Sequence, residues 1–137
     1  MKNLIAFSLA EYGAMGCPNE VIFVFREDDA LRFLYTSTED DITTYVPWLS
    51  TLKCDLFGIV RGVGDGWDHV DLGMGNHLFL INSVYDLLKE RIDGKSPSRI
   101  YQIWRDDLCA VLEARTVSEE YSDYSYRNDE LDRNPAW

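Results

Sequence analysis

The amino-acid sequence predicts one α+β domain, with a mixed or mainly antiparallel sheet of about four strands packed against about three to four helices. The chain has 137 residues, which is the length of one ordinary domain and enough to bury a core. Five consecutive β-branched or aromatic residues at 21–25 form a strong strand signal. Two stretches after residue 76 repeat apolar residues at three- and four-residue steps, which is typical of helices.

Short apolar runs predict the four strands. The run at 20–26 indicates a central strand that is buried on both faces. Residues 3–9 are predicted to be a first core strand rather than a signal peptide, because a serine interrupts the apolar run and an acidic residue soon follows it. Two weaker strands are predicted at 55–63 and 67–72.

Two short helices are predicted in the first half of the chain. Acidic residues at the start and a short apolar face indicate a helix over 28–36. Proline is tolerated in the first turn of a helix, so a second helix is predicted from Pro47 to about residue 54. The polar, acidic stretch 36–44 between them is predicted to be a loop.

Two longer helices are predicted in the second half. The apolar pattern predicts one helix over 77–93, with Asn76 as its cap and a glycine after its end. A cap at Ser96, followed by proline, predicts the other helix over about 98–114. A competing interpretation makes 77–82 a buried strand that precedes a shorter helix, and the sequence leaves both open.

Acidic side chains dominate the charge of the chain, with 24 Asp and Glu against 13 Lys and Arg and a net charge of −11. The net charge is −5 over 1–60, −2 over 61–115 and −4 over 116–137. The last segment is also rich in tyrosine, so we expect a globular domain over 1–115 and an acidic tail over 116–137, either packed or disordered.

The same composition bears on partners and compartment. The surplus of carboxylates would repel a polyanion, so no nucleic-acid partner is expected. A membrane span needs about 18 consecutive apolar residues, and no run in the chain is that long, so no membrane partner is expected. The three cysteines, Cys17, Cys54 and Cys109, form no C-x-x-C pair, which predicts reduced thiols in a cytoplasmic protein.

Both histidines lie in the segment 62–77, together with five glycines and three aspartates. The segment lacks the Gly-Lys-Ser/Thr of a phosphate loop and the alternating ligands of a calcium loop. His69 and His77 with one aspartate would supply the usual ligands of a transition metal. One hypothesis is therefore a small enzyme or a ligand- or metal-binding protein that uses this segment.

The acidic balance favours another function class, a binding protein for a basic partner. No nucleophile motif is present, and the spacing of the two histidines is not diagnostic of a metal site, so we expect no catalytic residue, no bound metal and no cofactor. Candidate partner contacts are acids beside aromatic residues, which are enriched at binding hot spots. These candidates are Glu39, Asp40, Asp41, Tyr45 and Trp48 in one group, and Asp65, Trp67, Asp68 and Asp71 in the other.

In size, acidity and lack of a signal sequence or catalytic motif, the chain resembles bacterial toxin-immunity proteins, including those of contact-dependent growth inhibition systems. This resemblance implies an inhibitor that covers the positive active cleft of a nuclease toxin. The expected partner is accordingly a basic protein toxin, and we expect that this chain is not an enzyme.

Overall fold

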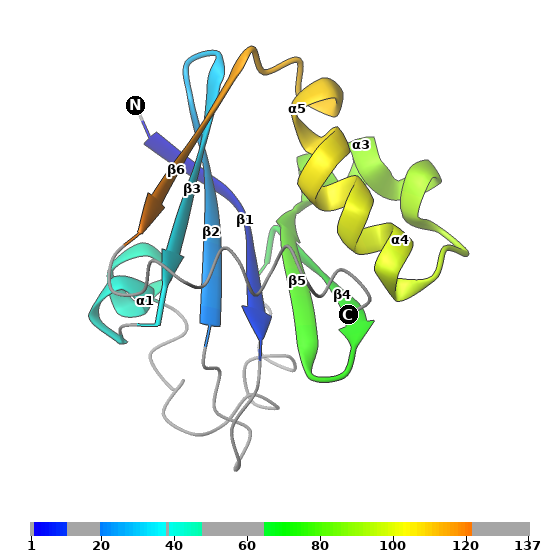
Figure 1. Ribbon diagram of the computed structural model, residues 1–137, viewed down its shortest axis with the longest axis horizontal. Helices are drawn as coiled ribbons and strands as arrows, with labels where there is room; N and C mark the ends of the chain where they lie inside the picture. The colour runs from blue at the N-terminus through cyan, green and yellow to red at the C-terminus, as the bar shows by residue number, and fades with distance from the viewer. Residues whose placement is uncertain (1, 11–19, 38, 48–64, 122–137) are drawn as a thin grey trace.

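The computed structural model describes residues 2–10, 20–37, 39–47 and 65–121. They form an α+β fold with a six-stranded mixed sheet in the order β4-β5-β1-β2-β3-β6 (Figure 1). Neighbouring strands are antiparallel, except that β6 runs parallel to β3. The strands are β1 (Lys2–Ala10), β2 (Glu20–Glu27), β3 (Ala30–Thr36), β4 (Trp67–Gly73), β5 (Asn76–Ile81) and β6 (Thr116–Tyr121).

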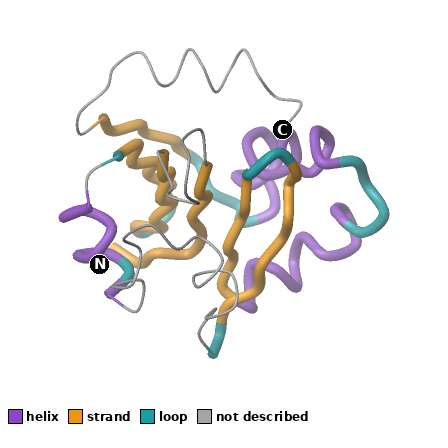
Figure 2. Tube along the Cα trace, turned by 90° about the horizontal axis from the view of Figure 1, so that it is seen from below, coloured by secondary structure: helices purple, strands orange, loops and turns teal. Residues whose placement is uncertain are grey.

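Helices lie on both sides of this sheet. The first, α1, stands on the opposite side from the others, as Figures 1 and 2 show. None of the helices in the described part of the chain has the length and apolar character that a membrane crossing requires. The helices are α1 (Glu39–Tyr45), α3 (Asn82–Ile92), α4 (Pro97–Gln102), the π-helix η2 (Ile103–Asp107) and α5 (Leu108–Val111).

Strand β2 lies between β1 and β3, as predicted for a central strand. Its apolar residues are at most 2% exposed. Ile22 and Val24 pack toward α3, α4, η2 and α5, on what we call the helix face. Phe23 and Phe25 pack on the opposite side, which we call the aromatic face and which also receives Ile42 of α1. The strands predicted at 3–9 and 67–72 are confirmed as β1 and β4.

The helix predicted over 28–36 is wrong, because most of this segment is β3. Asp28 and Asp29 form a two-residue turn, so that Glu27 lies opposite Ala30 in a hairpin. Side chains of β3 alternate between the two faces of the sheet. A short apolar run fits both helical and strand periods, and pairing with β2 decides between them.

The loop predicted over 36–44 is also wrong, since α1 begins at Glu39. Ile42 and Val46, four residues apart, turn their side chains into the aromatic face. The acidic residues hide this short helical period in the sequence. The helix predicted from Pro47 to about residue 54 and the strand predicted over 55–63 lie almost wholly outside the described residues.

In the second half, the competing interpretation of 77–93 is the correct one. Strand β5 ends at Ile81, whose extended backbone caps α3 without a side-chain hydrogen bond. Gly94 follows the end of α3 with a φ of 71°, as expected of a glycine at that place. The helical stretch over about 98–114 is confirmed, and Ser96 Oγ accepts the Arg99 N–H at its start. The sequence does not predict that η2 is a π-helix.

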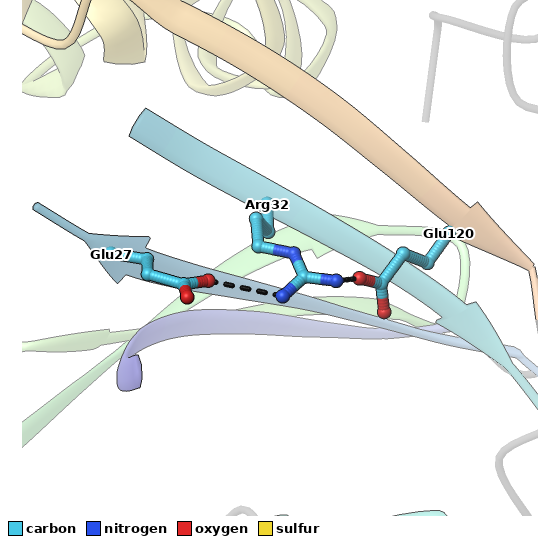
Figure 3. A network of polar contacts seen from close by, with 3 residues as sticks. All are labelled: Glu27, Arg32 and Glu120. Atoms are coloured by element: carbon cyan, nitrogen blue, oxygen red, sulfur yellow. Dashed lines mark hydrogen bonds and ion pairs between the residues drawn. The ribbon is translucent and has the colours of Figure 1, made fainter. Parts of the chain in front are cut away.

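Part of the segment expected as a tail belongs to the sheet, because residues 116–121 form β6. Arg32 on β3 holds this strand through an ion pair with Glu120 (Figure 3). The same guanidinium lies 3.0 Å from Glu27, so one positive charge is shared between carboxylates of two strands. The Arg32–Glu120 contact joins residues that are far apart in the sequence.

A second arginine links η2 to the same edge of the sheet. The Arg105 side chain is only 13% exposed and lies 3.8 Å from a carboxylate oxygen of Glu119. Arg105 also donates a hydrogen bond to the Tyr35 hydroxyl and lies over the Phe33 ring. Burial lowers the pKa of Arg105, but Tyr35 and Glu119 raise it more, so the net pKa is above its ordinary value and the cation persists.

The turn before β3 generates a stability prediction. Asp28 has a φ of 54°, and glycine is the residue that adopts this conformation without a steric penalty. Asp28→Gly should therefore raise the free energy of unfolding by about 0.5 kcal/mol in urea titrations. Asp29→Gly removes the same charge at a position without positive φ, and it should lower that free energy. Equal effects of the two variants would contradict this account of the turn.

Candidate functional site

The aromatic face is built around a row of three phenylalanine rings. The register places Phe79, Phe7 and Phe23 directly opposite one another on β5, β1 and β2. All three side chains are fully buried. The Phe7 and Phe79 rings are nearly parallel, with centroids 4.7 Å apart, and the Phe7 and Phe23 centroids are 6.0 Å apart. This row is a rigid base for the aromatic candidates of the predicted site.

Both described aromatic candidates rest on this base. The Tyr45 ring of α1 lies 5.4 Å from Phe23, and the Trp67 ring of β4 lies 5.3 Å from Phe7, measured between centroids. Both side chains are half-buried. The structure therefore brings one aromatic residue from each predicted group, Tyr45 and Trp67, to the same side of the sheet.

The acids of the first group lie at the start of α1. Asp40 is exposed, and its backbone carbonyl accepts hydrogen bonds from two threonine hydroxyls of the helix. Asp41 is half-buried and accepts a 2.9 Å hydrogen bond from the Thr36 hydroxyl. Trp48 and the side chain of Glu39 lie outside the described residues. Of the two acids whose side chains are described, Asp40 is the more exposed.

The second group lies on the hairpin formed by β4 and β5. Most of the segment 62–77 is this hairpin, with Met74 and Gly75 at its tip. The backbone N–H of Gly73 donates a 2.7 Å hydrogen bond to Asp71 Oδ1, which fixes the start of the turn. Two residues of the tip, Met74 and Gly75, have positive φ, and Met74 is 85% exposed.

Strand alternation divides the aspartates of the hairpin between the two faces. Asp71 shares the aromatic face with Trp67, because every second residue of a strand points to the same side, here Trp67, His69 and Asp71. Asp68 lies opposite Leu80 and shares the helix face with it. Asp65 is exposed in the turn that precedes β4. Carboxylates thus flank β4 on both faces instead of gathering around Trp67.

The two edges of the sheet differ in how their acids are neutralised. At β6, Glu119 and Glu120 are paired with Arg105 and Arg32. At β4, none of the three aspartates forms an ion pair within the described parts of the chain. The two arginines are the residues that sequence reasoning missed, since their contacts cross 88 and 14 positions of the sequence.

The two histidines meet across the hairpin. The Nε2 atom of His69 lies 2.8 Å from the Nδ1 atom of His77, so one ring donates and the other accepts. The rings are stacked, and His69 also lies against Phe79. Burial lowers the pKa of His69 below 6.5, the positive charge of His77 lowers it further, and Asp71 partly opposes both. As the pH falls through 6.5, the unfolded chain is protonated first, so this histidine reduces stability under acidic conditions.

Three other features of the described residues do not favour a catalytic or metal site. Within the described ranges, no group of three or more His, Cys, Asp or Glu side chains is placed to hold a metal ion. A cleft of about 260 Å³ between α3 and α4 contains neither histidine. Cys109 is a half-buried free thiol, and burial raises its pKa, so it is a poor nucleophile. The cleft is lined by Glu90, Arg91, Lys95, Arg99, Ile103 and Asp107.

Comparison with known proteins gave no significant match to any family, curated protein or solved structure. The function of the chain is therefore argued from its geometry and charge. The feature with the clearest chemical character is the β4–β5 hairpin, with its aspartates and the Trp67 ring.

The environment of His69 predicts opposite effects for two substitutions. His77→Asn removes a neighbouring positive charge and should raise the pKa of His69. Asp71→Asn removes the nearby carboxylate and should lower that pKa further. An NMR titration of the imidazole signals measures both shifts, and only one histidine remains in the His77→Asn protein. Shifts in the same direction would contradict the described contacts.

Proposed function

We propose that this chain is an acidic binding protein that inhibits a basic partner, as an immunity protein that neutralises a nuclease toxin in the cytoplasm. The observation that supports the proposal most is the set of three hairpin carboxylates, Asp65, Asp68 and Asp71. None of them pairs with a basic side chain in the described parts of the chain. Their charge is therefore available to the cations of a partner.

The contrast with β6 strengthens this argument. A chain with a net charge of −11 has more carboxylates than its own cations can neutralise. On β6, Glu119 and Glu120 form ion pairs with arginines of the same chain. A nuclease must bind phosphates, so its active cleft is positively charged. Unpaired carboxylates on a rigid hairpin would compete with those phosphates for the same cations.

Aromatic side chains next to the acids would supply the affinity that charge alone does not. Trp67 and Tyr45 are half-buried, so each ring is held by the phenylalanine row and still has exposed surface. Partly exposed aromatic residues on a rigid base lose little entropy on binding and are enriched among hot spots. Charge would accelerate association, and these rings would slow dissociation.

The alternative, a small enzyme or metal-binding protein that uses the 62–77 segment, has less support. The two imidazoles are hydrogen-bonded to each other through His69 Nε2 and His77 Nδ1, so these two nitrogens face each other and do not converge on a common metal position. Among the residues that the structure describes, the feature in its favour is that the fold brings His69 and His77 together. We therefore prefer the binding protein.

The proposal predicts a salt-dependent interaction with a basic protein. The purified chain should capture from lysate of its source cells a positively charged nuclease, and it should inhibit that nuclease at one-to-one stoichiometry. The association rate should fall by about tenfold or more between low and physiological salt. A hairpin variant with Asp65→Asn, Asp68→Asn and Asp71→Asn should associate about tenfold more slowly.

A control variant separates a specific site from net charge. It removes the same number of exposed acids from α3 and its C-terminal end, and it should change the association rate by less than about threefold. Equal slowing of both variants, or association that is insensitive to salt, would contradict the proposal. The control substitutions are Asp86→Asn, Glu90→Gln and Asp93→Asn.

A further inference from the structure

We propose that β4 binds an extended, basic segment of the partner as an additional strand of the sheet. This inference rests on the proposed function, because it specifies how the hairpin would bind its partner. It starts from the order of the described strands, in which β4 is an edge strand and β5 is its one described neighbour (Figure 1).

One hydrogen bond shows which backbone groups of β4 point away from the sheet. The Asn82 N–H donates to the Gly66 carbonyl, 2.8 Å away, and the register places these two residues opposite each other. In an antiparallel pair, hydrogen-bonded and non-hydrogen-bonded positions alternate. Asp68 and Val70 are therefore bonded to β5, and the N–H and C=O groups of His69 and Asp71 point outward.

These outward groups are a template for strand addition. In the described parts of the chain, no segment pairs with the outer edge of β4. An unpaired edge of this kind binds extended peptides through main-chain hydrogen bonds. The irregularity between Asp71 and Gly73 ends the regular ladder at the hairpin tip, so the added strand would pair along Trp67–Asp71.

The charges beside the edge determine which segment fits. Asp68 lies on one face of β4 and Asp71 on the other, with Asp65 just before the strand. Side chains of an added strand alternate in the same way, so lysines or arginines on either face would meet a carboxylate. Two copies of β4 would bring like charges together, which disfavours self-pairing. A basic segment is thus preferred over a second copy of this chain.

The other edge of the sheet lacks this preference. On β6, Arg105 and Arg32 already neutralise the two glutamates. A basic strand added there would have to compete with these internal ion pairs. Of the two edges, β4 has the stronger attraction for a cationic segment.

A peptide probe tests the inference without the natural partner. The probe is a labelled peptide of four Lys-Val repeats, whose binding to the full chain is measured by fluorescence anisotropy. A second peptide of the same sequence carries N-methyl groups on alternate amides, which keep its charge and block its hydrogen bonds. We expect the first peptide to bind and the N-methylated peptide to bind about tenfold more weakly.

Two substitutions at one position separate the contribution of the backbone N–H to peptide binding from the contribution of the carboxylate. Asp71→Asn removes the carboxylate and should weaken peptide binding about threefold. Asp71→Pro also removes the outward N–H and should weaken binding about tenfold further. An edge strand tolerates proline at such a position, because the lost N–H does not pair within the sheet. The matched control Asp86→Asn on α3 should leave binding unchanged. Thermal unfolding checks that each variant is folded, and the N-methylated peptide does not depend on any variant.

The possible outcomes distinguish this inference from the proposed function. Equal binding of the two peptides would overturn strand addition, even if a basic partner is captured and inhibited. Binding that requires free peptide amides and the Asp71 N–H would support it, even if no basic partner is captured. In that second case, it is the proposed function that fails.

Discussion

Burial of the sheet on both faces is the constraint on which the rest of the structure depends. The helix face is covered by α3, α4, η2 and α5, and the aromatic face is built on the row of Phe79, Phe7 and Phe23. The middle of β2, residues 21–25, therefore consists of continuous apolar residues that are at most 2% exposed. Most acids of this chain are left to turns, helix surfaces and the two edge strands.

The two edge strands carry similar charges in different environments. Arginines from β3 and η2 anchor β6 through its glutamates, so those acids help to hold the sheet together. Strand β4 is anchored instead by rings, since Trp67 packs against Phe7 and His69 packs against Phe79. Among the aspartates of that hairpin, Asp71 makes the internal contacts, through the hydrogen bond of its turn and its charge beside His69. This difference is what makes β4 a better candidate for interaction than β6.

Local sequence signals predicted part of this arrangement. Strands β1, β2 and β4 could be predicted from the sequence, because their apolar or alternating residues fit the strand period. The segments 30–36 and 39–45 are short, and their residues fit the helical period as well as the strand period. The predicted site segment does contain an exposed acidic hairpin, but the division of Asp68 and Asp71 between two faces depends on register. The pairing of Arg32 with Glu120 depends on tertiary structure and has no local signal.

Amide hydrogen exchange of β4 tests the central claim most directly. In the free protein, the amides of His69 and Asp71 should exchange rapidly, and those of Asp68 and Val70 should be protected by β5. Addition of the captured basic partner should slow exchange at His69 and Asp71. Protection of these two amides already in the free protein, or partner-induced protection confined to the helix face, would contradict the account.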